Sequence, residues 1–279
     1  MSEATPPTLD ALRKQIDAID GKLHELLRAR ADVVSHVSAA KAASADGAPT
    51  PAFRPGREAD VLRALVARHS GPLALPSLVR IWREIISGMT QMQQEVVVAA
   101  HRPDGGNGDG WDAARDHFGL GMRYLPMRRA RDVVAAVRDR RAGIGVLPAP
   151  GEEEGEEPWW PLLASDNSDL PRIVLKLPFL RPASSARPAR GHAVITLPGP
   201  EPEAADAYYL AIEAAPGESR DRVAAALKAA GVDAGPLIVA GDAGRYLAEA
   251  TGGWPASIDD AAIRHIVAIG GYPAPIAYD

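Results

Sequence analysis

Three amphipathic segments in the first hundred residues each carry polar side chains on an otherwise apolar stripe. In the first segment, apolar residues recur every three or four positions from Leu12 to Val37, and Arg30 occupies one slot of that series. Lys41 follows, about 20° round a helix from Arg30 and roughly 16 Å along it. A charge on an apolar face is costly unless an opposite charge meets it. The pattern therefore predicts an enclosed site for a small molecule that carries negative charge.

The second and third segments each add a polar group of another kind. Glu58 opens an apolar face that continues through Leu62 and Leu65, and Gln93 lies near the end of a stripe that includes Trp82. One polar residue on such a stripe is commonly a structural ion pair or a snorkelling side chain. The presence of such polar residues on all three segments instead favours a binding site. Two cations, a carboxylate and an amide suit a dianionic substrate that also carries a hydroxyl group.

Long helices are needed to position these residues. The first is expected from about Thr8 to about Ala43, far longer than the mean globular helix of about 11–12 residues. A second is expected to hold residues 57–69, and a third to begin near Pro76. The inner stripe of the third is Leu78, Trp82, Ile85, Met89, Gln93 and Val96. Three such helices make a poor monomeric core, so we expect a homodimer with intertwined first helices.

Composition narrows the class of protein. A length of 279 residues allows two or three domains, and a net charge of −5 argues against a nucleic-acid partner. The absence of cysteine excludes disulfides, cysteine-ligated zinc and thiol catalysis. The polar start and the lack of a membrane-length apolar run predict a cytoplasmic protein with no membrane partner. Histidine spacing gives no metal site and no phosphate loop is found, so no cofactor is expected.

After a glycine-rich run at 101–110, strands and helices alternate. Strands are expected at 96–100, 122–126, 143–147, 172–177 and 192–197, and helices at 113–118 and 130–141. From about residue 206 the expected order is strand 206–214, helix 219–232, hairpin 236–253, helix 257–266 and strand 267–276. This βαββαβ order is the ferredoxin-like plan. The predicted fold class is multidomain α plus α/β, with domains at 1–100, 101–200 and 201–279.

Three stretches resemble, in order, the three helices of the all-helical chorismate mutases over about residues 8–96. They are LRKQIDAIDGKLHELLRARADVVSHVSAAK, FRPGREADVLRAL and IWREIISGMTQMQQ. The resemblance implies conversion of chorismate to prephenate, an intramolecular rearrangement that needs no metal, nucleotide or nucleophile. Two positions depart from the family pattern: Arg54 stands where some members have Asp, and Met89 where many have Ser.

The resemblance also implies a role for each matching residue. Arg30, and Arg13 reaching into the partner subunit's site, would bind the two carboxylates. Lys41 and Gln93 would donate hydrogen bonds to the ether oxygen, and Glu58 would accept one from the ring hydroxyl. Arg57 and Met89 would line the substrate. Helix geometry agrees with sharing between subunits, because Arg13 lies about 25 Å from Arg30 along one helix.

The later part of the chain resembles, less completely, prephenate dehydratase and an ACT regulatory domain, to which this helical module is fused in many bacteria. WDAARDHFG and VAAVRDRRAGIGVLP resemble the first lobe of prephenate dehydratase, but Pro171 stands at the threonine of the Asn-x-Thr-Arg-Phe segment. The end, VAIGGYPAPI, resembles an ACT domain without its second effector motif. We expect a chorismate mutase whose first hundred residues act alone and whose remainder is non-catalytic. The alternatives are a bifunctional mutase–dehydratase and a non-catalytic regulatory protein that binds an aromatic amino acid.

Overall fold

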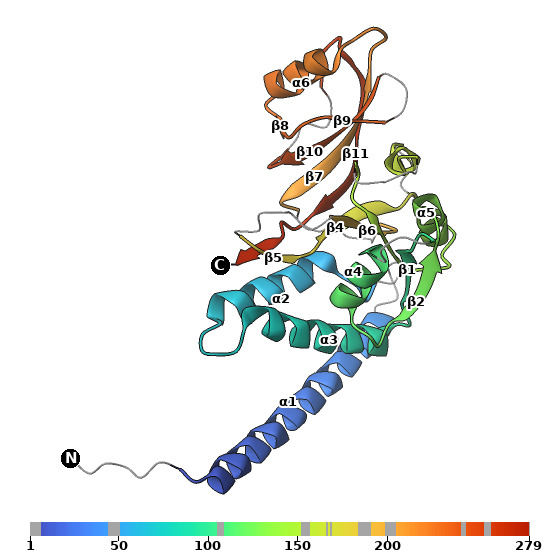
Figure 1. Cartoon of the computed structure of the whole chain (residues 1–279). Helices are drawn as coiled ribbons and strands as arrows, with labels where there is room; N and C mark the ends of the chain where they lie inside the picture. Colours follow the sequence, from blue (N-terminus) through green and yellow to red (C-terminus); the bar gives the residue numbers. More distant parts are fainter. Residues whose placement is uncertain are drawn as a thin grey trace, which may run out of the picture. The chain divides into compact units, whose positions relative to one another are not determined.

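The structure, a computed structural model, describes residues 7–43, 51–104, 109–151, 157–165, 167, 169–183, 191–198, 205–240, 244–253 and 258–278. The chain divides into two compact units, residues 1–50 and residues 51–279 (Figure 1). The expected class is confirmed: helices come first, and a mixed α/β region follows. No helix in the described ranges is long and apolar enough to cross a membrane.

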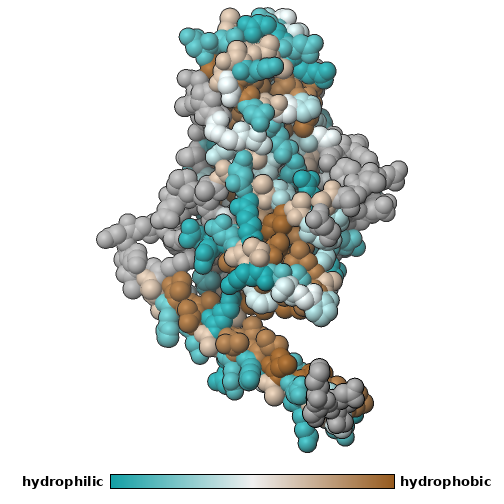
Figure 2. All heavy atoms as spheres, turned by 90° about the vertical axis from the view of Figure 1, so that its left-hand side faces the viewer, coloured by the Kyte–Doolittle hydropathy of each residue, from teal (hydrophilic) through white to brown (hydrophobic). Residues whose placement is uncertain are grey.

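The first unit contains one long helix, α1 (Leu9–Ala43). The Thr8 hydroxyl accepts a hydrogen bond of 3.3 Å from the backbone N–H of Ala11, which supports the predicted start. The apolar seam along α1 is exposed in the single chain, with Ile16 57%, Leu23 52% and Leu26 67% exposed. Figure 2 shows brown, apolar surface along the protruding helix. The predicted helix over 8–43 is therefore confirmed, and its seam lacks cover within one chain.

Helices α2 (Pro55–Arg68) and α3 (Leu75–Gln93) open the second unit. Each has proline in its first turn, where the missing N–H costs nothing. Their buried apolar side chains join one cluster with strands and helices further along the chain: Phe53, Leu62, Leu65, Val79 and Ile86 pack with Val98, Phe118, Leu175, Leu177 and Phe179. The core of α2 and α3 is therefore shared with the α/β region, which does not favour a first hundred residues that act alone.

A polar contact also ties α2 to the end of the chain. Arg63 donates to the carboxylate of Asp206 and, over 3.0 Å, to the carbonyl of Ala274. The backbone N–H of Ala274 donates to Asp206 as well, over 2.8 Å. The hydrogen bond from Ala274, followed by that from Arg63, lowers the pKa of Asp206. Arg63 of α2, near the start of the second unit, is thus bonded to Asp206 and Ala274 in the later part of that unit.

The strands and helices of the middle region match the predicted alternation. They are β1 (Val97–His101), α4 (Asp109–Phe118), β2 (Arg123–Met127), α5 (Ala130–Arg138), β3 (Ile144–Pro148), the 3-10 helix η1 (Trp160–Leu163), β4 (Arg172–Leu177), β5 (Leu180–Pro182) and β6 (His192–Thr196). Strand β1 pairs in parallel with β2 and β3, and β6 pairs antiparallel with β3 and β4. Helix α4 lies beside α3 (Figure 1).

The last region holds β7 (Ala207–Ala214), α6 (Arg220–Ala229), β8 (Asp233–Ala234), β9 (Ile238–Val239), β10 (Arg245–Thr251), β11 (Ile263–Tyr272) and β12 (Ile276–Tyr278). Strand β7 pairs antiparallel with both β10 and β11, and β9 pairs antiparallel with β10. The predicted strand, helix and hairpin at 206–253 are confirmed. Strand β12 pairs with β5 in a separate two-stranded sheet.

The predicted helix over 257–266 is wrong in its described part. Residues 258–262 are not helical, and residues 263–266 belong to β11. The Asp260 carboxylate accepts from the backbone N–H of Ala262 over 2.9 Å and from Arg222 of α6 over 2.7 Å. An aspartate that bonds to the backbone two residues on favours a turn over a helix. The second helix of the ferredoxin-like plan is therefore replaced by a turn that leads into β11.

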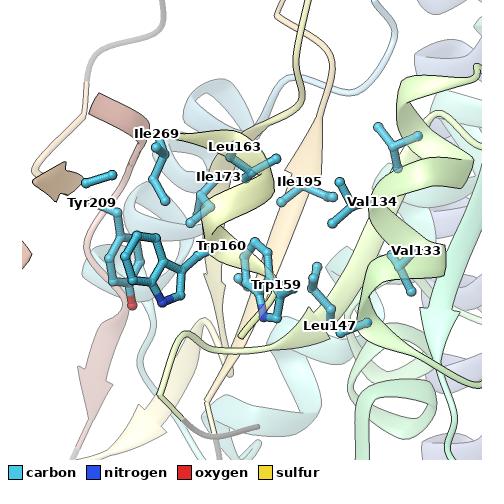
Figure 3. Close-up of a cluster of buried hydrophobic side chains, with 14 of the residues drawn as sticks. Val133, Val134, Leu147, Trp159, Trp160, Leu163, Ile173, Ile195, Tyr209 and Ile269 are labelled. Atoms are coloured by element: carbon cyan, nitrogen blue, oxygen red, sulfur yellow. The ribbon is translucent and has the colours of Figure 1, made fainter. Parts of the chain in front are cut away.

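Two neighbouring tryptophans fill the sheet face that α6 leaves open. Trp159 and Trp160 are each 1% exposed and pack with side chains from both halves of the sheet, including Leu147 and Tyr209 (Figure 3). The indole N–H of Trp159 donates to the carbonyl of Pro148 over 3.0 Å. The segment that holds Trp159 and Trp160 is therefore a structural element that covers this face of the sheet.

One sheet runs through the middle and last regions, in the order β2-β1-β3-β6-β4-β11-β7-β10-β8. The junction is the pairing of Ile173 in β4 with Gly270 in β11. A Cβ at residue 270 would lie 2.1 Å from the backbone oxygen of Ile173 and 2.5 Å from its nitrogen. Only glycine allows this approach. The predicted boundaries at residues 100 and 200 stay predictions.

We expect Gly270→Ala to lower the free energy of unfolding by at least about 2 kcal/mol, because overpacking against backbone forces the strands apart. Urea denaturation followed by circular dichroism measures it. Gly121→Ala is the control, since a Cβ there meets nothing within 4 Å. Equal stability of the two variants would show that β4 and β11 do not depend on this close approach.

Candidate functional site

The predicted cations of α1 lie along an exposed helix. Arg13 and Arg30 are both exposed. Arg13 forms an ion pair of 3.4 Å with Asp10, and both side chains are largely in solvent, where such a pair contributes little. Lys41 lies in the last turn of α1, and its side chain is outside the described residues. Within one chain, α1 therefore presents Arg13 and Arg30 to solvent without enclosing either of them.

The start of α2 places an acidic side chain in a buried ion pair. Glu58 lies in the first turn, where a negative charge is favoured by the helix dipole. Its Oε2 accepts from Nη1 of Arg83 in α3 over 2.9 Å, and the side chains are 12% and 6% exposed. The neighbouring Arg57 is exposed. The predicted carboxylate is therefore largely buried and is held by Arg83, which was not among the predicted site residues.

Arg83 is fixed at a second point. Its Nε donates to the backbone carbonyl of His117, at the end of α4, over 2.7 Å, and its guanidinium lies 6.0 Å from the centre of the Phe118 ring. Burial lowers the pKa of Arg83, and Glu58 raises it in part, but a guanidinium remains protonated in proteins. Burial, and then Arg83, lowers the pKa of His117. At neutral pH His117 is therefore uncharged beside the Arg83–Glu58 pair.

A sequence signal for Arg83 exists in retrospect. Val79 and Ile86 lie four residues before and three after it, and both are buried. This spacing defines a second apolar face on α3, and Arg83 interrupts that face as Arg30 interrupts the seam of α1. The stripe predicted for α3 is a different face, since Trp82, Met89 and other members of it are only half-buried. The more buried face of α3 is Val79, Arg83, Ile86, Ser87 and Thr90.

The third predicted helix ends at Gln93. This side chain and that of Met89 are half-buried, and Nε2 of Gln93 donates weakly to the Met89 carbonyl over 3.4 Å. Gln93 lies ten residues beyond Arg83, roughly 15 Å along the helix axis. The second unit thus brings Glu58 to Arg83 and Gln93 to Met89. The assignment of one common site to the seven predicted residues stays a prediction.

A family model for chorismate mutase type II matches residues 12–94. The match covers α1, α2 and α3, and it includes every residue for which a catalytic or binding role is predicted. Residues 12–94 are therefore similar to the chorismate mutase type II family, and they are called the mutase domain. Within this mutase domain, the structure adds Arg83 to the residues of interest and sets it against the α/β region.

Curated relatives extend the similarity past the mutase domain. The chain is 34% identical over 148 residues to the bifunctional chorismate mutase/prephenate dehydratase of Pseudomonas aeruginosa, a match that covers 53% of this chain and 40% of the relative. The corresponding protein of Stutzerimonas stutzeri is 35% identical over 156 residues, with 56% and 42% covered. The chain therefore matches well under half the length of these relatives.

Solved structures resemble the chain only distantly. A prephenate dehydratase from Streptococcus mutans is 12% identical, with a TM-score of 0.42 over 64% of this chain and 99% of the other. A protein described as a novel type of quorum quenching acylase is 18% identical, with a TM-score of 0.44 over 65% of this chain and 96% of the other.

The region after the mutase domain holds the segment that resembles the dehydratase motif. Pro171 is buried just before β4 and offers no hydroxyl. Arg172, the next residue, donates to the carbonyls of Leu163, Ser165 and Asn167 over 2.9, 3.1 and 2.9 Å. This arginine therefore organises its own loop, and the segment has no side-chain acid at position 171.

A cavity of about 200 Å³ is lined by residues of η1 and of the C-terminal strands. Its wall includes Trp160, Ala211 and Val267, and its rim includes Glu213 and Arg245. It contains none of the predicted residues. Among the described residues, no group of three or more His, Cys, Asp or Glu side chains is arranged to hold a metal ion.

Proposed function

We propose that the chain is a chorismate mutase that converts chorismate to prephenate. The observation that carries the proposal is the family match over residues 12–94, within which the predicted polar side chains stand on three helices. A site with arginine and lysine cations, a carboxylate and an amide fits a dianionic substrate with a hydroxyl group and an ether oxygen.

The proposed mechanism uses position and charge alone. Arg30 of one subunit and Arg13 of the partner bind the two carboxylates and hold the compact conformer. Lys41 and Gln93 donate hydrogen bonds to the ether oxygen as its C–O bond breaks and negative charge develops there. Glu58 accepts from the ring hydroxyl. Because the rearrangement is intramolecular, the enzyme neither gives nor takes a proton.

The working form that we propose is a homodimer. The exposed seam of α1 supports it, because a row of apolar side chains at helical spacing is stabilised by a second helix. A second copy of the chain supplies a helix with the same seam and closes the pair by two-fold symmetry. A monomer in analytical ultracentrifugation at assay concentrations would contradict this assembly. The cytoplasmic location stays a prediction.

The direct test is the loss of chorismate absorbance after purified protein is added. Turnover well above the uncatalysed rate is expected, without added metal or nucleotide. The bound dianion also predicts competitive inhibition by stable dicarboxylates that mimic the compact conformer. A rate equal to the uncatalysed one, with protein that circular dichroism shows to be folded, would rule out the proposal.

A bifunctional mutase–dehydratase is the second candidate, favoured by the relatives' activity and by a match longer than the mutase domain. Pro171 speaks against it, because the position has no hydroxyl to act as an acid. We expect no phenylpyruvate from prephenate at neutral pH. Mass spectrometry of the product measures this, with the Pseudomonas aeruginosa enzyme as positive control. Phenylpyruvate formed by this chain would establish the bifunctional alternative.

A further inference from the structure

Helix α3 closes the C-terminal end of α4 through three side chains. Arg83 donates to the His117 carbonyl over 2.7 Å, and Ser87 donates to the Phe118 carbonyl. Glu84 accepts from the backbone N–H of Leu120 over 3.2 Å. The last turn of a helix leaves carbonyls without intrahelical partners, so α3 supplies the donors that α4 lacks. The mutase domain and the α/β region are thereby joined by hydrogen bonds to main-chain atoms.

Of these three side chains, Arg83 also contacts α2. Its Nη1 meets Glu58 of α2 over 2.9 Å while its Nε stays on α4. The donors of a guanidinium are fixed in one rigid plane, so a fork held at one end sets the position of whatever meets the other end. The pair is nearly buried, and separating it would leave an uncompensated charge. The orientation of Glu58 is thus set by the end of α4.

We propose that Arg83 is a positioning residue for the mutase reaction, through which the α/β region holds Glu58 for the substrate hydroxyl. The inference rests on the proposed function, in which Glu58 accepts from that hydroxyl. A carboxylate has about four acceptor sites on its two oxygens, so pairing with Arg83 is compatible with a further hydrogen bond from substrate. The C-terminal region then supports catalysis without being catalytic.

A purely structural role for Arg83 does not explain why it pairs with Glu58. Val79, Ile86 and Ser87 on the same face already pack or bond α3 against the α/β region. A buried ion pair is seldom better for stability than apolar side chains of similar volume. The guanidinium adds a defined charge and geometry at the one carboxylate of the mutase domain that is proposed to meet substrate.

The test compares Arg83→Gln with Ser87→Ala in the full-length protein. Arg83→Gln removes the charge and the fork, and we expect kcat/KM for chorismate to fall by about 10- to 100-fold, since small misplacements of a reacting group are costly. Ser87→Ala removes the neighbouring bond to α4 and leaves Glu58 untouched. It should lower the urea midpoint while kcat/KM stays within about 2- to 3-fold, as for an interaction outside the reacting geometry.

A double-mutant cycle separates positioning from general damage. Glu58→Gln alone should lower kcat/KM, and adding Arg83→Gln should lower it little further, because both changes disable one unit. Arg83→Lys keeps the charge but cannot span both contacts, so its activity should fall between those of Arg83→Gln and the wild type. This variant also keeps the test decisive if Arg83→Gln does not fold.

The outcomes are distinct. If the wild-type protein converts chorismate and folded Arg83→Gln has the same kcat/KM, this inference is overturned and the proposed function is left intact. Additive losses of kcat/KM in the cycle would show that Arg83 acts independently of Glu58 and would overturn the inference. A faster Arg83→Gln would show that the pair withholds Glu58 from substrate, which also overturns it. Wild-type protein without mutase activity would overturn the proposed function and this inference together.

Discussion

Arg30→Ala is expected to lower kcat/KM for chorismate by at least about 100-fold, since one charged donor aimed at the reacting groups commonly contributes this much or more. The reason is its place on the apolar seam of α1, where we propose that it binds a substrate carboxylate in the dimer. The loss should appear with unchanged helix content. Initial rates from chorismate absorbance, with circular dichroism on the same samples, measure both.

Arg28→Ala is the matched control. Arg28 is an exposed arginine on the same helix, two residues earlier and therefore about 200° round the axis from Arg30. It should keep near-native activity, because the loss of charge from α1 is the same while the proposed site is unaltered. Equal activity of the two variants would show that Arg30 serves the helix or its assembly, and that the anionic substrate is bound elsewhere.

The sequence predicts the long elements of this chain closely, for identifiable reasons. Helix α1 begins one residue after the predicted Thr8 and ends at Ala43, because three-four spacing over ten turns leaves no other regular structure. Strand β4 has the predicted bounds of 172 and 177, and its burial alternates strictly. In both cases one local periodicity decides the element.

Elements that depend on contacts between residues distant in sequence are harder to predict. The helix expected at 257–266 has the composition of a helix, but the bonds from Ala262 and Arg222 to the Asp260 carboxylate select a turn. Arg222 is distant in sequence, and no local pattern contains it. The close approach of Gly270 to Ile173 is likewise invisible before the two strands are paired.

The candidate site divides in the same way. A polar residue on an apolar stripe marks Arg30, Glu58 and Gln93, whichever elements surround them. Arg83 was missed because α3 is apolar on two faces, and only the fold shows that one of them packs on α4. The shared core of α2 and α3 is hidden for the same reason, since every residue in it is an ordinary apolar one. The part of α1 in a site cannot be read from one chain, because we propose that a second chain completes that site.

Rescue between two inactive variants is the largest effect that the proposed dimer predicts. Arg13→Ala and Arg30→Ala should each be nearly inactive. In a mixed dimer, one site carries both lesions and the other carries neither, because each site takes Arg30 from one subunit and Arg13 from its partner. After full exchange of equal amounts, half of the dimers are mixed, so about a quarter of wild-type activity should return by the symmetry of an isologous pair.

The control is a mixture of Arg30→Ala with Lys41→Ala, because the same subunit supplies both of these residues to one proposed site. Each site of that mixed dimer carries one lesion, so no activity should return. Subunit exchange is followed in both mixtures by energy transfer between labelled chains. Exchange without rescue in the first mixture would place Arg13 and Arg30 of the same subunit in one site. Since they lie about 25 Å apart along α1, that result would require α1 to bend or break, and the long straight seam would lose its meaning as a dimer interface.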